Sequence, residues 1–451
     1  MQEMKKARFE ALAAYCRLPQ ALFYAEEVRW LQAHDEAILI VVIRDFEDGD
    51  YAAMFLARDL KERYRWISIT KFFETETEAL AAAPEQVEKL FADLDQERKQ
   101  GDEKGKPVDF FTPVVAAVKL NPDFKTITSL EGYSPTLELI KPMMRWFEDA
   151  DGNFVEQFQT TGFDARLWEL YLFAALVEAG YVFEKSEPMP DFCAKSLRGQ
   201  ICVEATTVNP SLGPDGAPVP PPPKETPEQL LAYQREYMPI RFAGPLTAKL
   251  AKKYWEKAHV QDMPLLFAIQ DFHAPMSMTG TGSSLAIYLY GVVWEADKDA
   301  NGNLVIKSAN VTQHNWGVKA IDSGFFRLPG SEHISAVISN PSATISKFNR
   351  MGMVAGFGSP RVRMIREGTM PSLDPNTKEP LHFTRNVNAQ DYTEDWMEGM
   401  SVYHNPNALR PLHPAQLPGA AHHFLRADGM LETFVPKFQP FSSVTLISVV
   451  E

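Results

Sequence analysis

Residues 161–208 have the sequence TGFDARLWELYLFAALVEAGYVFEKSEPMPDFCAKSLRGQICVEATTV. The first third of this stretch spaces its apolar side chains with a helical period, which predicts a helix over 163–179 with a wide apolar face. Gly180 follows that segment and is typical of a helix end. Three strand-like segments come next, at 181–184, 191–195 and 201–208. The stretch therefore predicts a helix followed by three strands.

The second and third of these strands are expected to form an antiparallel hairpin. With a two-residue turn at 198–199, which has glycine in second place, Asp191 lies opposite Thr206. Because side chains alternate along a strand, Asp191 and Glu204 share one face as diagonal neighbours, roughly 7 Å apart at the backbone. Two carboxylates on one face at that spacing can bind the same divalent ion.

Such a pair of carboxylates has the chemistry that phosphodiester hydrolysis requires. Mg²⁺ held by carboxylates and water polarises the phosphate and supplies a hydroxide-like nucleophile, and a nearby lysine offsets the developing charge. The competing interpretation is an acidic, solvated hairpin. The apolar neighbours Phe192, Ile201 and Val203 disfavour a fully solvated hairpin.

These motifs resemble the PD-(D/E)xK superfamily, which has the restriction-endonuclease-like fold. The matching residues are Glu169 on the helix, Pro190 and Asp191 before the hairpin, and Glu204-Ala205-Thr206 on its second strand. The similarity continues through a helix that opens at Gly244 and a strand at 264–271, so that the order is α-β-β-β-α-β. It covers about a quarter of the chain, and its order and spacing are more specific than any single motif.

The resemblance implies a metal-dependent nuclease that hydrolyses phosphodiester bonds in DNA, in bacterial defence or repair. It implies that Asp191 and Glu204 hold Mg²⁺ or Mn²⁺, and that Glu169 is a third acid of the site. Without the resemblance, Glu169 is equally well a surface residue of the helix.

The chain departs from the superfamily pattern at Thr206, which stands where a lysine is expected. The Thr206 hydroxyl can hold a metal-bound water, or it is a strand residue without a role. Some members of the superfamily place this lysine on the next helix, where Lys249 is the best candidate. Lys195 is the second candidate, because it shares the hairpin face. If neither reaches the site, the alternative function is a degenerate, non-cleaving scaffold that binds nucleic acid or protein. A hydrolase acting on a non-nucleic substrate is a third hypothesis.

The only clear basic stretch lies at 347–366, in a chain whose net charge is −14. We expect four of its residues to contact nucleic-acid phosphates, namely Lys347, Arg350, Arg361 and Arg363. A structural basic segment that neutralises acidic groups is an equally good interpretation. The late histidines do not have a known zinc-ligand spacing.

Composition places the chain among ordinary globular proteins, with 45% hydrophobic and 23% charged residues. The pI of about 5.3 argues against a general nucleic-acid coat protein, although an enzyme needs only a local basic groove. Three cysteines are too few for a disulfide framework, and no apolar run is long enough to span a bilayer. We therefore expect a cytoplasmic protein that is not in a membrane. The sequence leaves a homodimer open.

The expected fold is α/β of the mixed α+β kind, divided into four parts. We expect an N-terminal α+β domain at 1–105, because the charged, glycine-containing run that follows residue 96 resembles a linker. A connecting region at 106–160 leads to the restriction-endonuclease-like core at 161–345. A loop-rich C-terminal extension at 346–451 completes the chain.

Overall fold

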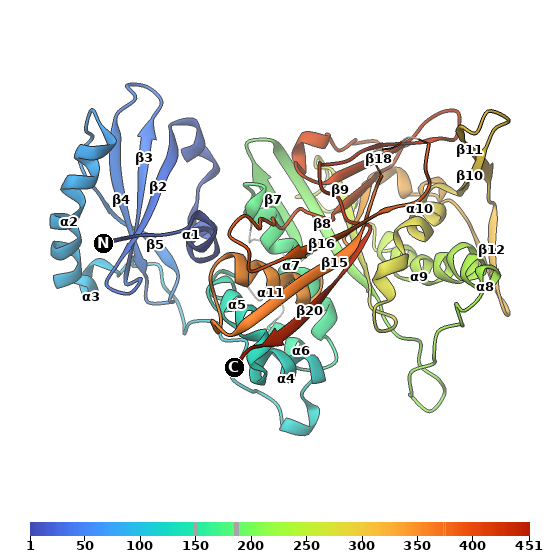
Figure 1. Cartoon of the computed structure of the whole chain (residues 1–451), viewed down its shortest axis with the longest axis horizontal. Helices are drawn as coiled ribbons and strands as arrows, with labels where there is room; N and C mark the ends of the chain where they lie inside the picture. Colours follow the sequence, from blue (N-terminus) through green and yellow to red (C-terminus); the bar gives the residue numbers. More distant parts are fainter. Residues whose placement is uncertain (148–151, 185–188, 373, 375) are drawn as a thin grey trace.

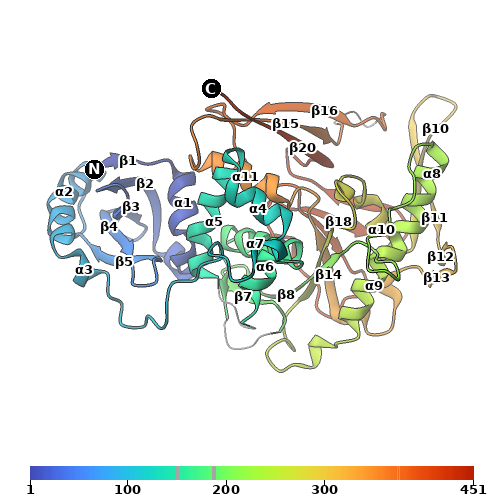
Figure 2. The ribbon, with the colours of Figure 1, turned by 90° about the horizontal axis from the view of Figure 1, so that it is seen from below.

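The computed structural model of this chain describes residues 1–147, 152–184, 189–372, 374 and 376–451. It is a mixed α+β structure, with an N-terminal sheet at one end and a larger body built around a second sheet (Figure 1). Helix α1 (Lys6–Ala13) lies between the N-terminal sheet and α5 (Ser134–Trp146) in both views (Figures 1 and 2).

The N-terminal sheet is antiparallel and has the strand order β1-β2-β3-β4-β5. Its strands are β1 (Gln2–Glu3), β2 (Ala25–Ala33), β3 (Ile38–Asp45), β4 (Tyr51–Arg58) and β5 (Tyr64–Ile69). Strand β3 alternates its apolar side chains between two cores. Ile38 and Ile40 pack on α2 (Glu76–Ala92), whereas Leu39 and Val41 join the large core of the body. The sheet is therefore covered on both faces.

Short helices connect this sheet to the body. They are α3 (Leu94–Glu97), α4 (Pro122–Ser129), α5 and α6 (Phe154–Gln159). Aromatic rings of this region, among them Phe110, Phe154 and Phe158, pack against one another with centroids 4.8 to 6.2 Å apart. This packing buries α5 and α6 against the body, because each ring removes a large apolar surface from water.

The central sheet has eight strands in the order β19-β18-β17-β14-β9-β8-β7-β6. Its strands are β6 (Val182–Phe183), β7 (Phe192–Ser196), β8 (Gly199–Val208), β9 (Leu265–Asp271), β14 (Ile334–Ser339), β17 (Ser401–His404), β18 (Ala421–Leu425) and β19 (Leu431–Phe434). Strands β8, β9 and β14 are parallel neighbours, and β6, β7 and β8 pair antiparallel. The sheet thus has a parallel centre, which requires helical crossovers on its faces.

Two helices cover opposite faces of β8. Ile201, Val203 and Ala205 belong to the core that contains α7 (Phe163–Glu178), and Cys202 and Val208 belong to the core that contains α9 (Met238–Leu250). Even-numbered side chains of β8, including Glu204, therefore point to the α9 side.

The remaining elements enclose this arrangement. Between β8 and β14 lie α8 (Pro227–Ala232), α9, α10 (Gly282–Tyr290) and two hairpins, which are formed by β10 (Val292–Lys298) with β11 (Leu304–Asn310) and by β12 (Gln313–Trp316) with β13 (Lys319–Asp322). After β14 come α11 (Ile345–Val354) and a three-stranded sheet of β16 (Leu381–Asn386), β15 (Val362–Met370) and β20 (Ser442–Val449).

The structure corrects two expectations about the fold. The C-terminal part is not a loop-rich extension, because β17, β18 and β19 belong to the central sheet and β15, β16 and β20 form a sheet of their own. The hairpin turn falls at Leu197 and Arg198, one residue earlier than expected, because Ser196 pairs with Gly199. The side chain of Ser196 supports this turn by accepting a hydrogen bond from the N–H of Arg198 (3.1 Å).

In the part of the chain that the structure describes, no helix is long and apolar enough to cross a membrane.

Candidate active site

Asp191 and Glu204 face each other across the β7–β8 hairpin. Phe192 pairs with Val203, and the same register continued by one residue sets Asp191 directly opposite Glu204 rather than diagonal to it. The turn shift moves the partner by two residues, so the two acids stay on one face. The N–H of Asp191 donates to Glu204 Oε2 (3.3 Å), and Asp191 Oδ2 accepts from the N–H of Ala205 (2.7 Å). The two carboxylates are thus held together by backbone hydrogen bonds.

Lys249 reaches this pair from α9. Its Nζ forms an ion pair with Glu204 Oε1, whose side chain is 3% exposed. Lys249 lies in the last turn of the helix, and 21% of its side chain is exposed. The partner of the buried Glu204 carboxylate is therefore a lysine that is itself partly open to solvent. Of the two candidate lysines of the sequence prediction, Lys249 is therefore the one that contacts Glu204.

Tyr254 completes the surroundings of Glu204. Its hydroxyl donates a hydrogen bond to Glu204 Oε1 (2.6 Å), and the residue is 1% exposed. Helix α9 ends at Leu250, and Lys253 adopts a left-handed conformation (φ 50°) that turns the chain back before Tyr254. A hydroxyl among apolar residues five positions after the lysine was the only sequence signal for this contact.

Glu169 lies on α7, and its charge acts on the same group. Its carboxylate pairs with Arg166 (2.7 Å), and its side chain is 14% exposed. Burial raises the pKa of Glu169, opposed by Arg166, while the charges of Lys249 and Glu204 also act on it. Glu169 is therefore electrostatically part of the cluster, although its direct partner is Arg166.

The neighbouring acids of the cluster act on the pKa of Asp191. Desolvation by the surrounding protein raises the pKa of Asp191 above its usual range, and the negative charges of Glu204 and Glu169 raise it further. Asp191 also retains surface open to water, which screens these charges and limits the shift. Burial and the neighbouring carboxylates also raise the pKa of the Tyr254 phenol, so it stays a hydrogen-bond donor.

The other two predicted residues of the site lie apart from this contact. Thr206 follows Glu204 on the same face of β8, half-buried and paired with Ile269 of β9. The expectation that Lys195 is a lysine of this site is not met. Lys195 lies opposite Gln200 near the turn and forms an ion pair with Glu184. Four residues of strand, about 13 Å, separate Gln200 from Glu204.

The basic stretch does not form the expected phosphate-binding surface. Lys347 and Arg350 are buried, and both pair with Glu394 (2.8 Å each) inside the body. Their charges are neutralised there and cannot reach a phosphate.

The two remaining arginines of that stretch are exposed but engaged locally. The Arg361 guanidinium donates to Glu131 (2.9 Å), and that of Arg363 donates to the carbonyl oxygens of Pro360 and Val362 (2.7 and 2.9 Å). These contacts agree with the alternative interpretation, in which the basic stretch is structural and neutralises acidic groups of the protein.

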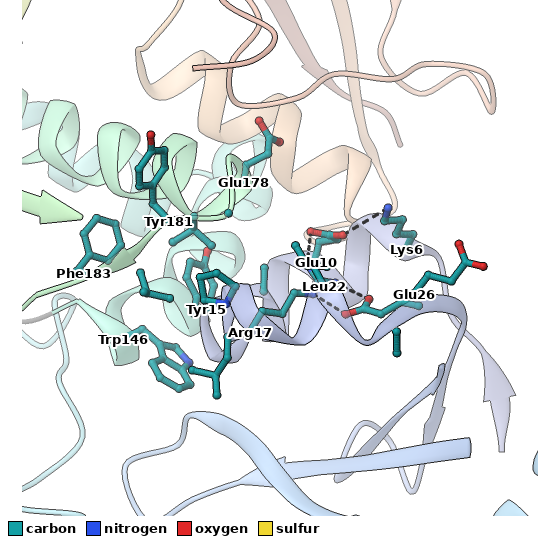
Figure 3. Close-up of a pocket in the computed structure, with 18 of the residues that line it drawn as sticks. Lys6, Glu10, Tyr15, Arg17, Leu22, Glu26, Trp146, Glu178, Tyr181 and Phe183 are labelled. Atoms are coloured by element: carbon teal, nitrogen blue, oxygen red, sulfur yellow. Dashed lines mark hydrogen bonds and ion pairs between the residues drawn. The ribbon is translucent and has the colours of Figure 1, made fainter. Parts of the chain in front are cut away.

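A cavity of about 450 Å³ lies elsewhere, between the N-terminal sheet and α7 (Figure 3). Arg17 and Lys6 form ion pairs with Glu10 at 2.9 and 3.8 Å along its wall, and the ring of Tyr15 stacks on Phe173. None of the predicted site residues lines it. The cluster of Asp191, Glu204 and Lys249 at the hairpin is thus separate from this cavity.

Within the described residues, no group of three or more histidine, cysteine or acidic side chains is arranged to hold a metal ion. A metal at the hairpin would therefore have two direct protein carboxylates, Asp191 and Glu204, with Glu169 further away. That donor set fits Mg²⁺, which keeps several waters and is commonly bound through one or two carboxylates together with substrate phosphate oxygens.

No protein-family model, curated protein or solved structure matches this chain.

Proposed function

We propose that the chain is a metal-dependent nuclease that hydrolyses phosphodiester bonds in DNA, with its site at the β7–β8 hairpin on a restriction-endonuclease-like core. The observation that carries the proposal is the convergence of Asp191, which directly precedes β7, with Glu204 of β8 and Lys249 of α9. The chain order α7, β6, β7, β8, α9, β9, with the short helix α8 between β8 and α9, supports it as well.

The two carboxylates would hold Mg²⁺ or Mn²⁺, which supplies a polarised phosphate and an activated water when bound. The residues of the chain have separate tasks in this proposal. Asp191 and Glu204 provide oxygen ligands from opposite strands of a rigid hairpin. Tyr254 holds Glu204 in one orientation through its hydrogen bond to Oε1.

Lys249 provides the positive charge at the reacting phosphate. In the structure, its ammonium forms an ion pair with the buried carboxylate of Glu204. With a divalent ion held by Asp191 and Glu204, the Lys249 ammonium would be available to donate to the attacking water or to a phosphate oxygen. Lys252 lies exposed three residues further on and adds a basic group for the nucleic-acid backbone.

Cleavage assays on supercoiled and linear DNA test this proposal. We expect wild-type protein to nick or cut DNA with Mg²⁺ or Mn²⁺ and to be inactive in EDTA. Asp191→Asn and Glu204→Gln should each reduce the rate at least about a hundredfold, since each removes a ligand charge at the metal. Glu184→Gln, which alters an acid on the neighbouring strand, is the matched control and should cleave at the wild-type rate. Equal activity in all four proteins would sink the assignment.

The second candidate function is a non-cleaving scaffold, and Thr206 is the observation that favours it. A threonine on β8 leaves the strand without the usual lysine, and Lys249 is engaged with Glu204. This alternative predicts DNA binding without cleavage under any divalent ion, and that binding should survive Asp191→Asn. Gel-shift and cleavage assays on the same samples distinguish the two functions.

A further inference from the structure

The cavity between the N-terminal sheet and α7 has a second cavity beside it. The first has a volume of about 450 Å³, and the second, of about 690 Å³, is also bounded by α11 and by the segment at 393–397. Seven residues line both cavities, and they come from α1, from the segment that follows it and from the end of α7. Both volumes are within the range of small-molecule sites, which is about 300–1,000 Å³.

Glu178, the last residue of α7, lines both cavities. Its two carboxylate oxygens accept hydrogen bonds from the backbone N–H groups of Trp396 (2.9 Å) and Met397 (3.0 Å), which fix the orientation of the carboxylate. The residue is nevertheless exposed, so a ligand in the cavity can reach it. Each carboxylate oxygen has two lone pairs, so the group keeps acceptor sites that the backbone does not use.

Glu178 has no cationic partner among the described residues. Its neighbours in the lining, Glu10 and Glu27, both pair with Arg17 (2.9 and 2.6 Å). Although Glu178 is exposed to the cavities, the protein around it removes part of its hydration, and this desolvation together with the charge of Asp395 raises its pKa to about 7. A cation bound beside Glu178 would favour its charged form.

The first cavity is aromatic at one end and charged at the other. In the view of Figure 3, Phe183 and Trp146 lie at one end of the lining and Glu178 and Lys6 at the other, with Tyr15 between them. Aromatic rings pack well on flat apolar groups, and their faces attract cations. The lining therefore favours a ligand that has an aromatic or apolar body and a positive charge at one end.

We propose that the first cavity binds an organic cation, a protonated amine on an aromatic or apolar body, with the Glu178 carboxylate as its counter-ion. The ammonium donates to Glu178, and the body packs on the aromatic rings. Hydrogen bonds between an ammonium and a carboxylate are about twice as strong as those between neutral groups. The site does not depend on the proposed cleavage of DNA, since no residue of the hairpin cluster lines either cavity.

Isothermal titration of the full chain at pH 8 in EDTA tests the proposal. The probes are tryptamine and the smaller phenethylamine, whose amines are protonated at this pH. Tryptophol keeps the indole ring of tryptamine and has a hydroxyl in place of the amine, and indole-3-propionate has a carboxylate. We expect saturable binding of at least one amine. If tryptamine binds, tryptophol should bind at least about tenfold more weakly and indole-3-propionate should not bind, because only the amine brings a positive charge to Glu178.

Three variants locate the binding of the amine. Glu178→Gln keeps the size of the side chain and an acceptor for the backbone but removes the charge, and should weaken affinity at least about tenfold. Val177→Phe enlarges a residue that lines both cavities, leaves Glu178 unchanged, and should weaken affinity by a similar factor. Glu26→Gln is the matched control, because this glutamate lines the first cavity but already pairs with Arg44 (3.6 Å), and its affinity should stay within about twofold of wild type. Thermal unfolding checks that each variant is folded.

The pH dependence separates an ion pair at Glu178 from uptake by an apolar cavity. An amine that binds the carboxylate must displace its proton, so affinity should rise by up to about tenfold between pH 6 and pH 8. This slope should be absent in Glu178→Gln. The other charged groups that act on Glu178 or line the two cavities near it are Asp395, Glu394, Lys347, Lys6, Glu10 and Arg17.

Each contrary outcome overturns the proposal. It fails if neither amine binds, if tryptophol binds as tightly as tryptamine, or if Glu178→Gln and Val177→Phe both keep the wild-type affinity. Ca²⁺, titrated without EDTA, is the inorganic probe. Binding of Ca²⁺ that is lost in Glu178→Gln, with no binding of either amine, would assign the cavity to a metal ion instead. None of these results depends on whether DNA is cleaved.

Discussion

The ammonium of Lys249 on α9 contacts the buried carboxylate of Glu204 on β8, across the face of the central sheet. These residues are far apart in the sequence and meet because α9 packs on the even-numbered face of β8. Asp191 stands opposite Glu204 on the hairpin, so one lysine faces two acids. The predictions below follow from this arrangement.

Asp191→Asn should stabilise the metal-free protein slightly while removing metal binding. The raised pKa of Asp191 shows that its ionised form is disfavoured in the fold, so a neutral amide relieves repulsion from Glu204 and Glu169. In EDTA at pH 8 we expect Tm to rise by about 1–2 °C. Adding Mg²⁺ should raise the Tm of the wild type but not that of the variant. Asp48→Asn, at an exposed turn, should retain the Mg²⁺ response, and loss of that response there would contradict the assignment.

Mg²⁺ affinity should increase with pH. A carboxyl with a raised folded pKa binds its proton in the metal-free fold at pH values where it is ionised in the unfolded chain. Its protonation therefore stabilises the metal-free fold at low pH, and this stabilisation is lost as pH rises through the folded pKa. Metal binding must displace that proton, so affinity rises by up to about tenfold per pH unit for each proton released. Calorimetric titrations between pH 5.5 and 8.5 check the slope. A flat profile would mean that Asp191 and Glu169 are already ionised throughout.

Tyr254→Phe should weaken the site and also lower the free energy of unfolding, because it removes a buried hydrogen bond to Glu204. Tyr254 acts as a positioning residue, because its hydroxyl orients Glu204 and does not contact substrate. Loss of a hydrogen bond to a charged group costs about 1.5–3 kcal/mol, so Mg²⁺ affinity should fall at least about tenfold. Tyr181→Phe is the control, since that buried hydroxyl donates to the carbonyl oxygen of Gln416 instead. If both variants lose Mg²⁺ affinity equally, the effect is general destabilisation and not positioning.

The buried basic cluster should matter for stability and not for nucleic acid. Glu394→Gln leaves Lys347 and Arg350 buried beside a neutral group, which should destabilise the protein by about 3–5 kcal/mol. Arg361→Ala breaks only an exposed pair with Glu131 and should leave the urea midpoint unchanged. Urea unfolding measures both effects. A tenfold loss of DNA affinity in Arg361→Ala would restore the phosphate-binding interpretation.

Local patterns were enough to predict most of the hairpin region. The apolar period placed the helix at 163–179, and α7 spans Phe163–Glu178. The two strands at 191–208 were also predicted, but the expected pairing was shifted by two residues: Glu204, and not Thr206, lies opposite Asp191. The reason is that the turn depends on a hydrogen bond to the Ser196 hydroxyl and not on the glycine alone. Asp191 and Glu204 kept a common face, since a shift of two preserves the alternation.

Long-range pairing was beyond the sequence. The basic stretch at 347–366 was predicted to be exposed, because the acids that pair with its buried residues, Glu394 and Glu398, come later in the chain and cannot be assigned as partners from the sequence. The segment at 285–293 is apolar on all sides, so it has no periodicity that distinguishes a helix from a strand, and in the structure α10 spans Gly282–Tyr290. Strands β17, β18 and β19 lie among Pro, His and Asn residues that carry no such pattern.

The measurement that tests the central claim most directly is Mg²⁺-dependent nicking of supercoiled plasmid by Lys249→Met and Lys195→Met in parallel. The two variants remove the same charge from two candidate lysines, of which Lys249 contacts Glu204 and Lys195 pairs with Glu184. We predict at least about a hundredfold loss of rate for Lys249→Met and a rate within about twofold of wild type for Lys195→Met. Wild-type rates in Lys249→Met, or no metal-dependent nicking by the wild type, would contradict the account.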